Sequence, residues 1–90
     1  MIEATVAVNN DVGLHARPAA TFVKLAKTFQ SDITIANLTR GSDPVDAKSL
    51  VKIFKAAVAS GHEIRITAEG ADAQQAVDAL VGLIESNFGE

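Results

Sequence analysis

The chain has 90 residues, 48% of them hydrophobic, and eight lysine and arginine residues against eleven aspartate and glutamate residues give a formal net charge of −3. This length predicts one domain over residues 1–90, large enough to bury its own core. The acidic balance and the lack of tryptophan and tyrosine argue against nucleic-acid binding. The lack of cysteine excludes disulfides and thiolate sites. No apolar run reaches the roughly 20 residues of a membrane span, and no secretory signal is visible, so we expect a cytoplasmic protein that does not insert into a membrane.

The first two predicted elements are a strand and a helix. Residues 2–8 alternate between apolar and other side chains, which predicts a strand with one buried face, followed by a turn at 9–11. Pro18 suits only the first turn of a helix, because it has no N–H to donate. We therefore expect a helix that begins within a residue or two of 15–17 and ends near Phe29 or Gln30. Its expected buried stripe is Ala19, Phe22, Val23, Ala26 and Phe29.

The middle of the chain predicts a hairpin and a short second helix. Strands over Asp32–Asn37 and Val45–Ala47 would pair across a turn-rich loop, with Ile33 and Ile35 facing inward. Ser49 precedes an apolar helical run and is a candidate N-cap. Gly61 fits the C′ position that would end this helix. The run is apolar on more than one side, so part of it must face outward.

The last two predicted elements are a strand over Glu63–Ala68 and a final helix. Asp72 and Gln75 resemble a capping box at the start of that helix. The complete order is β-α-β-β-α-β-α, and the half-polar strands favour an antiparallel sheet. The expected fold class is α+β, a two-layer open-faced β-sandwich whose four-stranded antiparallel sheet is covered on one face by three helices. The inward positions are Ile64, Ile66 and Ala68 on the strand and Val77, Leu80, Val81, Ile84 and Phe88 on the helix.

The junction between the first strand and the first helix carries the candidate chemistry. His15 has an imidazole that is often uncharged near neutral pH and is then nucleophilic. A helix N-terminus offers unpaired backbone N–H groups that bind phosphate, and the Arg17 guanidinium matches phosphate oxygens. These groups could hold a phosphoryl group on the ring, but the spacing alone fits an ordinary histidine at a helix cap better, because short motifs give many false matches. His62 is too distant in sequence to suggest a metal site with His15, and we expect no metal and no cofactor.

The motif Gly13-Leu14-His15-Ala16-Arg17-Pro18 resembles the active-site motif of the HPr family, the histidine-containing phosphocarriers of the bacterial phosphoenolpyruvate:sugar phosphotransferase system. The stretches 19–27, 47–51 and 68–72 resemble further family landmarks, so the resemblance covers essentially the whole chain. It implies a covalent phosphoryl carrier rather than an enzyme, with His15 as acceptor through Nδ1 and Arg17 stabilising the phosphoryl group. Phosphorylated Enzyme I would be the donor, and the IIA domain of a sugar permease would be the recipient.

The resemblance also bears on Ser49 and on a docking surface. In many HPr proteins the matching serine is phosphorylated by a dedicated kinase, so a regulatory role beside the capping role stays open, with a kinase/phosphorylase and a transcriptional regulator as further possible partners. Exposed apolar patches on small proteins tend to be binding sites. The expected docking surface comprises Thr21, Lys24 and Lys27 with Leu50, Val51, Lys52 and Phe54.

Three further expectations complete the interpretation. The alternatives to a sugar phosphocarrier are a regulatory module that only binds and a paralogous carrier of a nitrogen-related or dihydroxyacetone-type phosphorelay. A shuttling carrier is expected to be a monomer. The loop Asn37 to Pro44 is a few residues longer than the family's usual hairpin loop, which concerns the hairpin geometry rather than the function.

Overall fold

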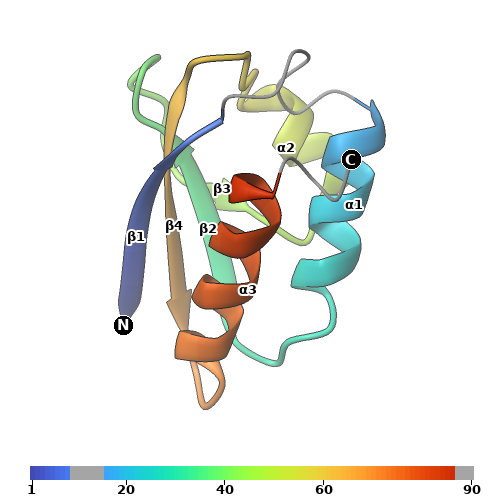
Figure 1. Cartoon of the computed structure of the whole chain (residues 1–90), viewed down its shortest axis with the longest axis vertical. Coiled ribbons are helices and arrows are strands. Elements are labelled where there is room, and N and C mark those ends of the chain that lie inside the picture. Colours follow the sequence, from blue (N-terminus) through green and yellow to red (C-terminus); the bar gives the residue numbers. More distant parts are fainter. Residues whose placement is uncertain (9–15, 87–90) are drawn as a thin grey trace.

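The computed structural model describes residues 1–8 and 16–86, and their backbone forms four strands and three helices in the predicted order (Figure 1). The predicted Asn9–Asp11 turn and the predicted helix position of Phe88 lie outside the described residues. The strands are β1 (Ile2–Ala7), β2 (Asp32–Asn37), β3 (Val45–Asp46) and β4 (Glu63–Glu69), and the helices are α1 (Ala16–Ala26), α2 (Leu50–Lys55) and α3 (Ala73–Glu85).

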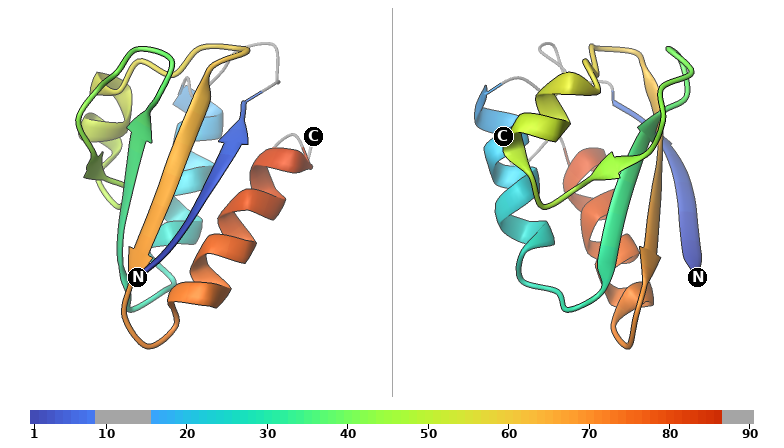
Figure 2. Two further views of the ribbon diagram at one scale, coloured as in Figure 1. Left: turned by 90° about the vertical axis from the view of Figure 1, so that its left-hand side faces the viewer. Right: turned by 180° about the vertical axis from the view of Figure 1, so that it is seen from behind.

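The four strands form one antiparallel sheet in the order β1-β4-β2-β3. The predicted hairpin is present, with Ile35 opposite Val45. Figure 2 shows that the three helices cover one face of this sheet and leave the other face open. The expected two-layer, open-faced α+β sandwich is therefore confirmed.

The core lies between the helices and the covered face of the sheet. Along β4 every second side chain is buried, because successive strand residues point to opposite faces. Along β2 the inward-facing Ile33 and Ile35 are buried, and so are Ala36 and Asn37 at the end of the strand. The helical stripes supply the opposing layer, with Phe22 and Leu80 fully buried. The buried members of the core that were expected from periodicity are Ala19, Phe22, Val23, Ala26, Ile33, Ile35, Ile64, Ile66, Ala68, Val77, Leu80 and Ile84, with Val81 partly buried.

The predicted end of α1 is wrong by three or four residues. The helix ends at Ala26, and the N–H groups of Thr28 and Phe29 donate to carbonyls only three residues back. Beyond this turn, the backbone N–H groups of Gln30 and Ser31 donate to the carboxylate of Asp72, at 2.8 and 2.9 Å. After this tighter turn, the Asp72 carboxylate therefore holds the segment that leads from α1 into β2.

The predicted end of α2 is also wrong. The helix ends at Lys55, and Ala57, not Gly61, adopts the left-handed conformation that follows it, with φ 52°. Gly61, with φ 86°, instead lies in the turn before β4, where its N–H donates to the Val8 carbonyl at 2.7 Å. At this end the side-chain amide of Asn37 donates to the carbonyls of Ala56 and Ala57, which the helix leaves without helical partners.

The predicted capping box of α3 is not formed. Asp72 occupies the N-cap position, but its side chain makes no capping hydrogen bond, because both carboxylate oxygens face Gln30 and Ser31. Gly70 lies against Ser31 so closely that a Cβ atom there would stand 2.8 Å from the Ser31 Cα atom. This close approach brings the start of α3 onto the turn before β2.

Candidate functional site

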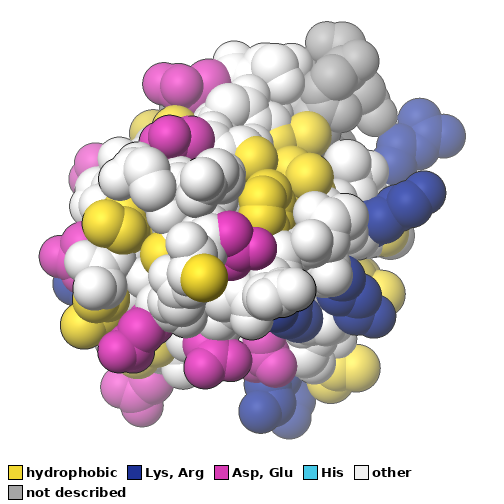
Figure 3. Space-filling model, turned by 90° about the horizontal axis from the view of Figure 1, so that it is seen from below, with side chains coloured by type: hydrophobic (Ala, Val, Ile, Leu, Met, Phe, Trp, Pro, Cys, Tyr) yellow, Lys and Arg dark blue, Asp and Glu magenta, His cyan; other side chains and the backbone are white. Residues whose placement is uncertain are grey.

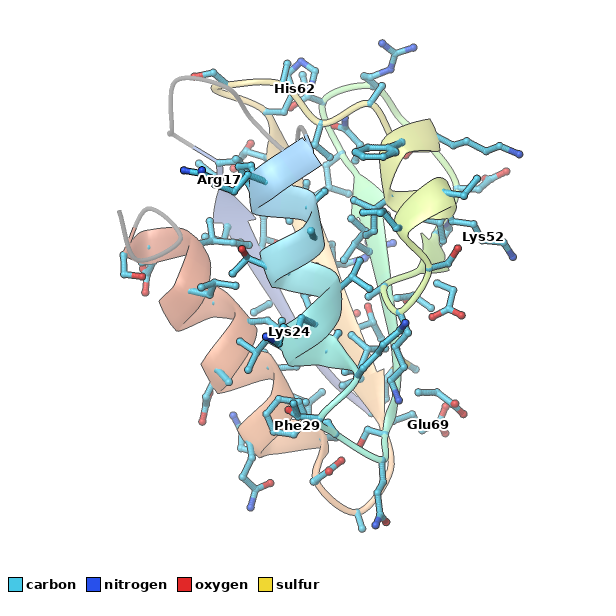
Figure 4. All side chains as sticks on the ribbon, turned by 90° about the vertical axis from the view of Figure 1, so that its right-hand side faces the viewer. Arg17, Lys24, Phe29, Lys52, His62 and Glu69 are labelled. Atoms are coloured by element: carbon cyan, nitrogen blue, oxygen red, sulfur yellow. The ribbon has the colours of Figure 1, made fainter. Side chains whose placement is uncertain are left out.

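The amino-terminal end of α1 is the part of the predicted site that the structure describes. Arg17, the second residue of the helix, is exposed, and Figure 4 shows it at this end of α1. Pro18 is buried in the first turn, where its missing N–H costs no helical hydrogen bond. The hydroxyl of Thr21 donates to the Arg17 carbonyl at 3.1 Å. His15 lies outside the described residues, so its geometry relative to Arg17 stays a prediction.

Ser49 caps α2 as expected. Its backbone is extended, with φ −113° and ψ 114°, and its Oγ accepts from the backbone N–H of Lys52 at 3.3 Å. The carbonyl of Ser49 accepts the first helical hydrogen bond, from Ile53 at 3.0 Å. The capping prediction is confirmed, and the suggested phosphorylation of Ser49 stays a prediction.

The apolar side chains predicted to face outward from α2 are exposed. Leu50, Val51 and Phe54 retain 38%, 63% and 44% of their accessible surface, whereas Ile53 between them is completely buried. The six residues of α2 make less than two turns; one side of the helix packs on the core through Ile53, and the other side presents three apolar side chains to solvent. Such a cluster on so small a protein is typical of a binding surface.

The lysines predicted to surround this cluster are exposed as well. Lys24 on α1, Lys27 just beyond it and Lys52 on α2 are all exposed, while Thr21 is half-buried, and α1 and α2 pack against each other. The segments 16–31 and 47–62 contain six lysine and arginine residues and no carboxylate side chain. Figure 3 shows lysine and arginine gathered along one side of the molecule, with aspartate and glutamate concentrated elsewhere on the visible surface. The helical side therefore combines exposed apolar groups with positive charge.

Two residues that the sequence analysis did not assign lie at the carboxyl-terminal end of α2. Asn37 is fully buried at the end of β2, and its Nδ2 donates to the Ala56 carbonyl at 3.0 Å. The same amide nitrogen lies 3.1 Å from Nδ1 of His62. The turn-forming character of residues 37–44 was the only signal in the sequence, and it pointed to a loop rather than to a buried amide.

Residues 1–8 and 16–86 contain no group of three histidine, cysteine, aspartate or glutamate residues placed to hold a metal ion. Among the helices that the structure describes, none is both long and apolar enough to cross a membrane.

Comparison with known proteins places this geometry in a family. Residues 2–86 match the family model described as "PTS HPr component phosphorylation site". The chain is 51% identical over 72 residues to the phosphocarrier protein HPr of Haemophilus influenzae, which covers 80% of this chain and 81% of that protein. The crystal structure of HPr-C-His from Thermoanaerobacter tengcongensis superposes with a TM-score of 0.94 at 44% identity, covering 100% of this chain and 98% of that one.

A second kind of relative is much longer. The multiphosphoryl transfer protein of Haemophilus influenzae is 47% identical over 89 residues, 99% of this chain but 18% of that protein. The multiphosphoryl transfer proteins of other bacteria are covered to between 22% and 24% of their length. The chain thus spans about a fifth to a quarter of these relatives.

Proposed function

This chain belongs to the HPr family of the phosphotransferase system, and on that premise we propose that it carries a phosphoryl group covalently on His15. The observation that supports this most directly is the family match over residues 2–86, which includes the motif from Gly13 to Pro18. Residues 1–90 would act as one HPr-like phosphocarrier domain. The chain would be a carrier rather than an enzyme, because it would itself be the phosphoryl acceptor in one reaction and the phosphoryl donor in the next.

The proposed chemistry uses the start of α1. In-line transfer would form a bond between phosphorus and Nδ1 of the neutral His15 imidazole as the bond from phosphorus to the donor breaks. The backbone N–H groups of the first helical turn and the exposed Arg17 would stabilise the charge on the phosphoryl oxygens. A second in-line transfer would then regenerate free His15.

The proposed partners are phosphorylated Enzyme I as donor and the IIA domain of a sugar permease as recipient. Both would dock on Leu50, Val51 and Phe54, whose exposure supports a binding role, with acidic groups facing the lysines around them. Because donor and recipient would use one surface in turn, we propose that the carrier works as a monomer in the cytoplasm. Phosphorylation of Ser49 would add negative charge beside this surface and weaken docking of acidic partners.

The test is a phosphorylation assay followed by mass spectrometry. Incubation with Enzyme I and phosphoenolpyruvate should add one acid-labile phosphoryl group to the chain. The gain should vanish in His15→Ala and persist at the end point in His62→Gln, which leaves His15 as the sole histidine. No gain in the unmodified chain, or an equal gain in His15→Ala, would refute the carrier function.

A further inference from the structure

Asn37 is a buried polar residue whose side-chain amide is hydrogen-bonded through both its nitrogen and its oxygen. Its Nδ2 donates to the carbonyls of Ala56, at 3.0 Å, and Ala57, at 3.4 Å, while its Oδ1 accepts from the backbone N–H of Arg40 at 3.3 Å. Its backbone exchanges two further hydrogen bonds with Ser42, each 3.0 Å long. A fully buried amide is retained at little cost only when its groups are paired in this way. Asn37 therefore joins the loop after β2 to the end of α2.

His62 orients this amide. The backbone N–H of Ala59 donates to His62 Nδ1 at 3.1 Å, and because a backbone N–H can only donate, Nδ1 is unprotonated and the ring carries its hydrogen on Nε2. Asn37 Nδ2, which can only donate, lies 3.1 Å from the same ring nitrogen. We call the hydrogen-bonded pair of Asn37 and His62 the node. The carbonyl of His62 accepts from the N–H of Val8 at 2.9 Å, so the node is also bonded to the residue after β1. Figure 4 shows His62 at the same end of the molecule as Arg17.

The helix held by this node cannot set its own position. An isolated helix of six residues is far below the length that is stable in water, so α2 depends on contacts at its ends and on its buried face. At its start, Ser49 accepts from Lys52; at its end, Asn37 donates to two carbonyls. Ala57 is held there in a left-handed conformation that alanine disfavours. Asn37, oriented by His62, therefore helps to hold α2 in place at its carboxyl-terminal end, and with it the exposed side of the helix.

We propose that Asn37 and His62 are positioning residues for partner docking: they hold the carboxyl-terminal half of α2, and with it Phe54, in the arrangement that the partner binds. The inference rests on the proposed function, in which α2 supplies the apolar centre of the docking surface. It assigns a role to the long loop at 37–44, in which Ser42 Oγ accepts from the backbone N–H of Asn37 and the backbone N–H of Arg40 donates to its Oδ1.

The kinetic test separates positioning from chemistry. In transfer from phosphorylated Enzyme I, Asn37→Ala should raise the KM for this chain by about 3- to 10-fold, the effect of losing one to two hydrogen bonds, with kcat little changed. His62→Phe is a second variant for the case that Asn37→Ala does not fold. It keeps a ring but removes the Nδ1 acceptor, and it should also raise the KM. Leu83→Ala, half-buried on α3, is the control for a general loss of stability and should leave the KM unchanged.

Two measurements on the free protein test the node without any partner. The ¹⁵N chemical shifts of the His62 ring should show the Nε2–H tautomer, and hydrogen exchange at the amides of Ala56 and Ala57 should accelerate in Asn37→Ala but not in Leu83→Ala. An Nδ1–H tautomer, unchanged exchange, or an equal KM in all variants would overturn the positioning role. If the unmodified chain accepts no phosphoryl group, the proposed function fails instead, and the tautomer and exchange results still decide whether the node holds α2.

Discussion

Arg17 is the residue whose environment bears most directly on the proposed transfer. It is exposed at the start of α1, where helical N–H groups and the guanidinium can both face an anion. We expect Arg17→Ala to lower the kcat of phosphoryl transfer by about 10- to 100-fold, the value of one or two charge-assisted hydrogen bonds. The measurement is a single-turnover rate with phosphorylated Enzyme I.

A matched arginine provides the control for that experiment. Arg40 is also exposed but lies in the loop after β2, so Arg40→Ala removes the same charge from another part of the molecule. It should leave kcat within about twofold of the unmodified chain. Equal effects of the two substitutions would remove Arg17 from the site.

Ala57 offers a prediction about stability. Its φ of 52° is costly for alanine by about 1–2 kcal/mol, and glycine adopts it without strain, although glycine also gains freedom in the unfolded chain. Because Ala57 is exposed, little packing is lost, and Ala57→Gly should stabilise the fold by about 0.5–1 kcal/mol. Denaturant unfolding measures this difference. Ala59→Gly, at an exposed residue without positive φ, should destabilise instead.

At the scale of elements, Asp72 joins the start of α3 to the turn between α1 and β2. The hydroxyl of Ser31 donates to its carboxylate, and this bond, followed by the N–H groups of Gln30 and Ser31, lowers the pKa of Asp72 below its usual value. A carboxyl group whose pKa is lower in the folded state contributes stability above its unfolded pKa, about 3.9, and loses that contribution as the pH falls through the folded value. The contact should therefore stabilise the fold at neutral pH and fail in acid.

The corresponding experiment compares two aspartates of the same segment. Asp72→Asn should reduce the free energy of unfolding at pH 7, and its difference from the unmodified chain should shrink as the pH falls below about 4. Asp78→Asn, on the exposed side of α3, should have a smaller effect at pH 7. A constant difference between Asp72→Asn and the unmodified chain down to pH 2 would show that the charge of Asp72 is not what stabilises the contact.

At the scale of the whole molecule, charge is distributed unevenly although the net charge is only −3. Six of the eight basic side chains belong to the two segments, 16–31 and 47–62, that contain α1 and α2 and have no carboxylate side chain. The open face of the sheet instead carries both signs of charge, with Glu3 and Arg65 beside the neutral Thr67. Such a distribution orients an approaching acidic partner toward the helical side and accelerates association at low salt. Docking should therefore weaken as ionic strength rises.

Two substitutions that remove one positive charge each test this orientation. Lys24→Gln on α1 should lower the association rate with Enzyme I by about two- to fivefold at low salt and make that rate less sensitive to sodium chloride. Arg65→Gln, on the open face of the sheet, should change neither by as much. Stopped-flow association at several salt concentrations measures both, and equal effects would show that net charge, rather than its placement, governs docking.

The sequence by itself determined which elements form, in what order, and which face each buries. Alternation along β4 and helical spacing along α1 and α3 are local properties, and burial of apolar surface then requires a sheet covered by helices. The exposure of Val51 and the capping by Ser49 follow from equally local patterns. The motif around His15 and Arg17 was likewise visible without a structure.

Only the tertiary structure decided where α1 and α2 end and what the polar residues near those ends do. The carboxylate of Asp72 binds amides 41 and 42 residues away, and the amide of Asn37 binds carbonyls 19 and 20 residues away. Local sequence assigned Asp72 to a capping box and Asn37 to a strand end, because no short-range pattern reports a partner that folding brings close. The physical reason is that backbone groups near a helix end have no helical partner, and the packing of the whole chain decides which polar side chain lies close enough to bind them.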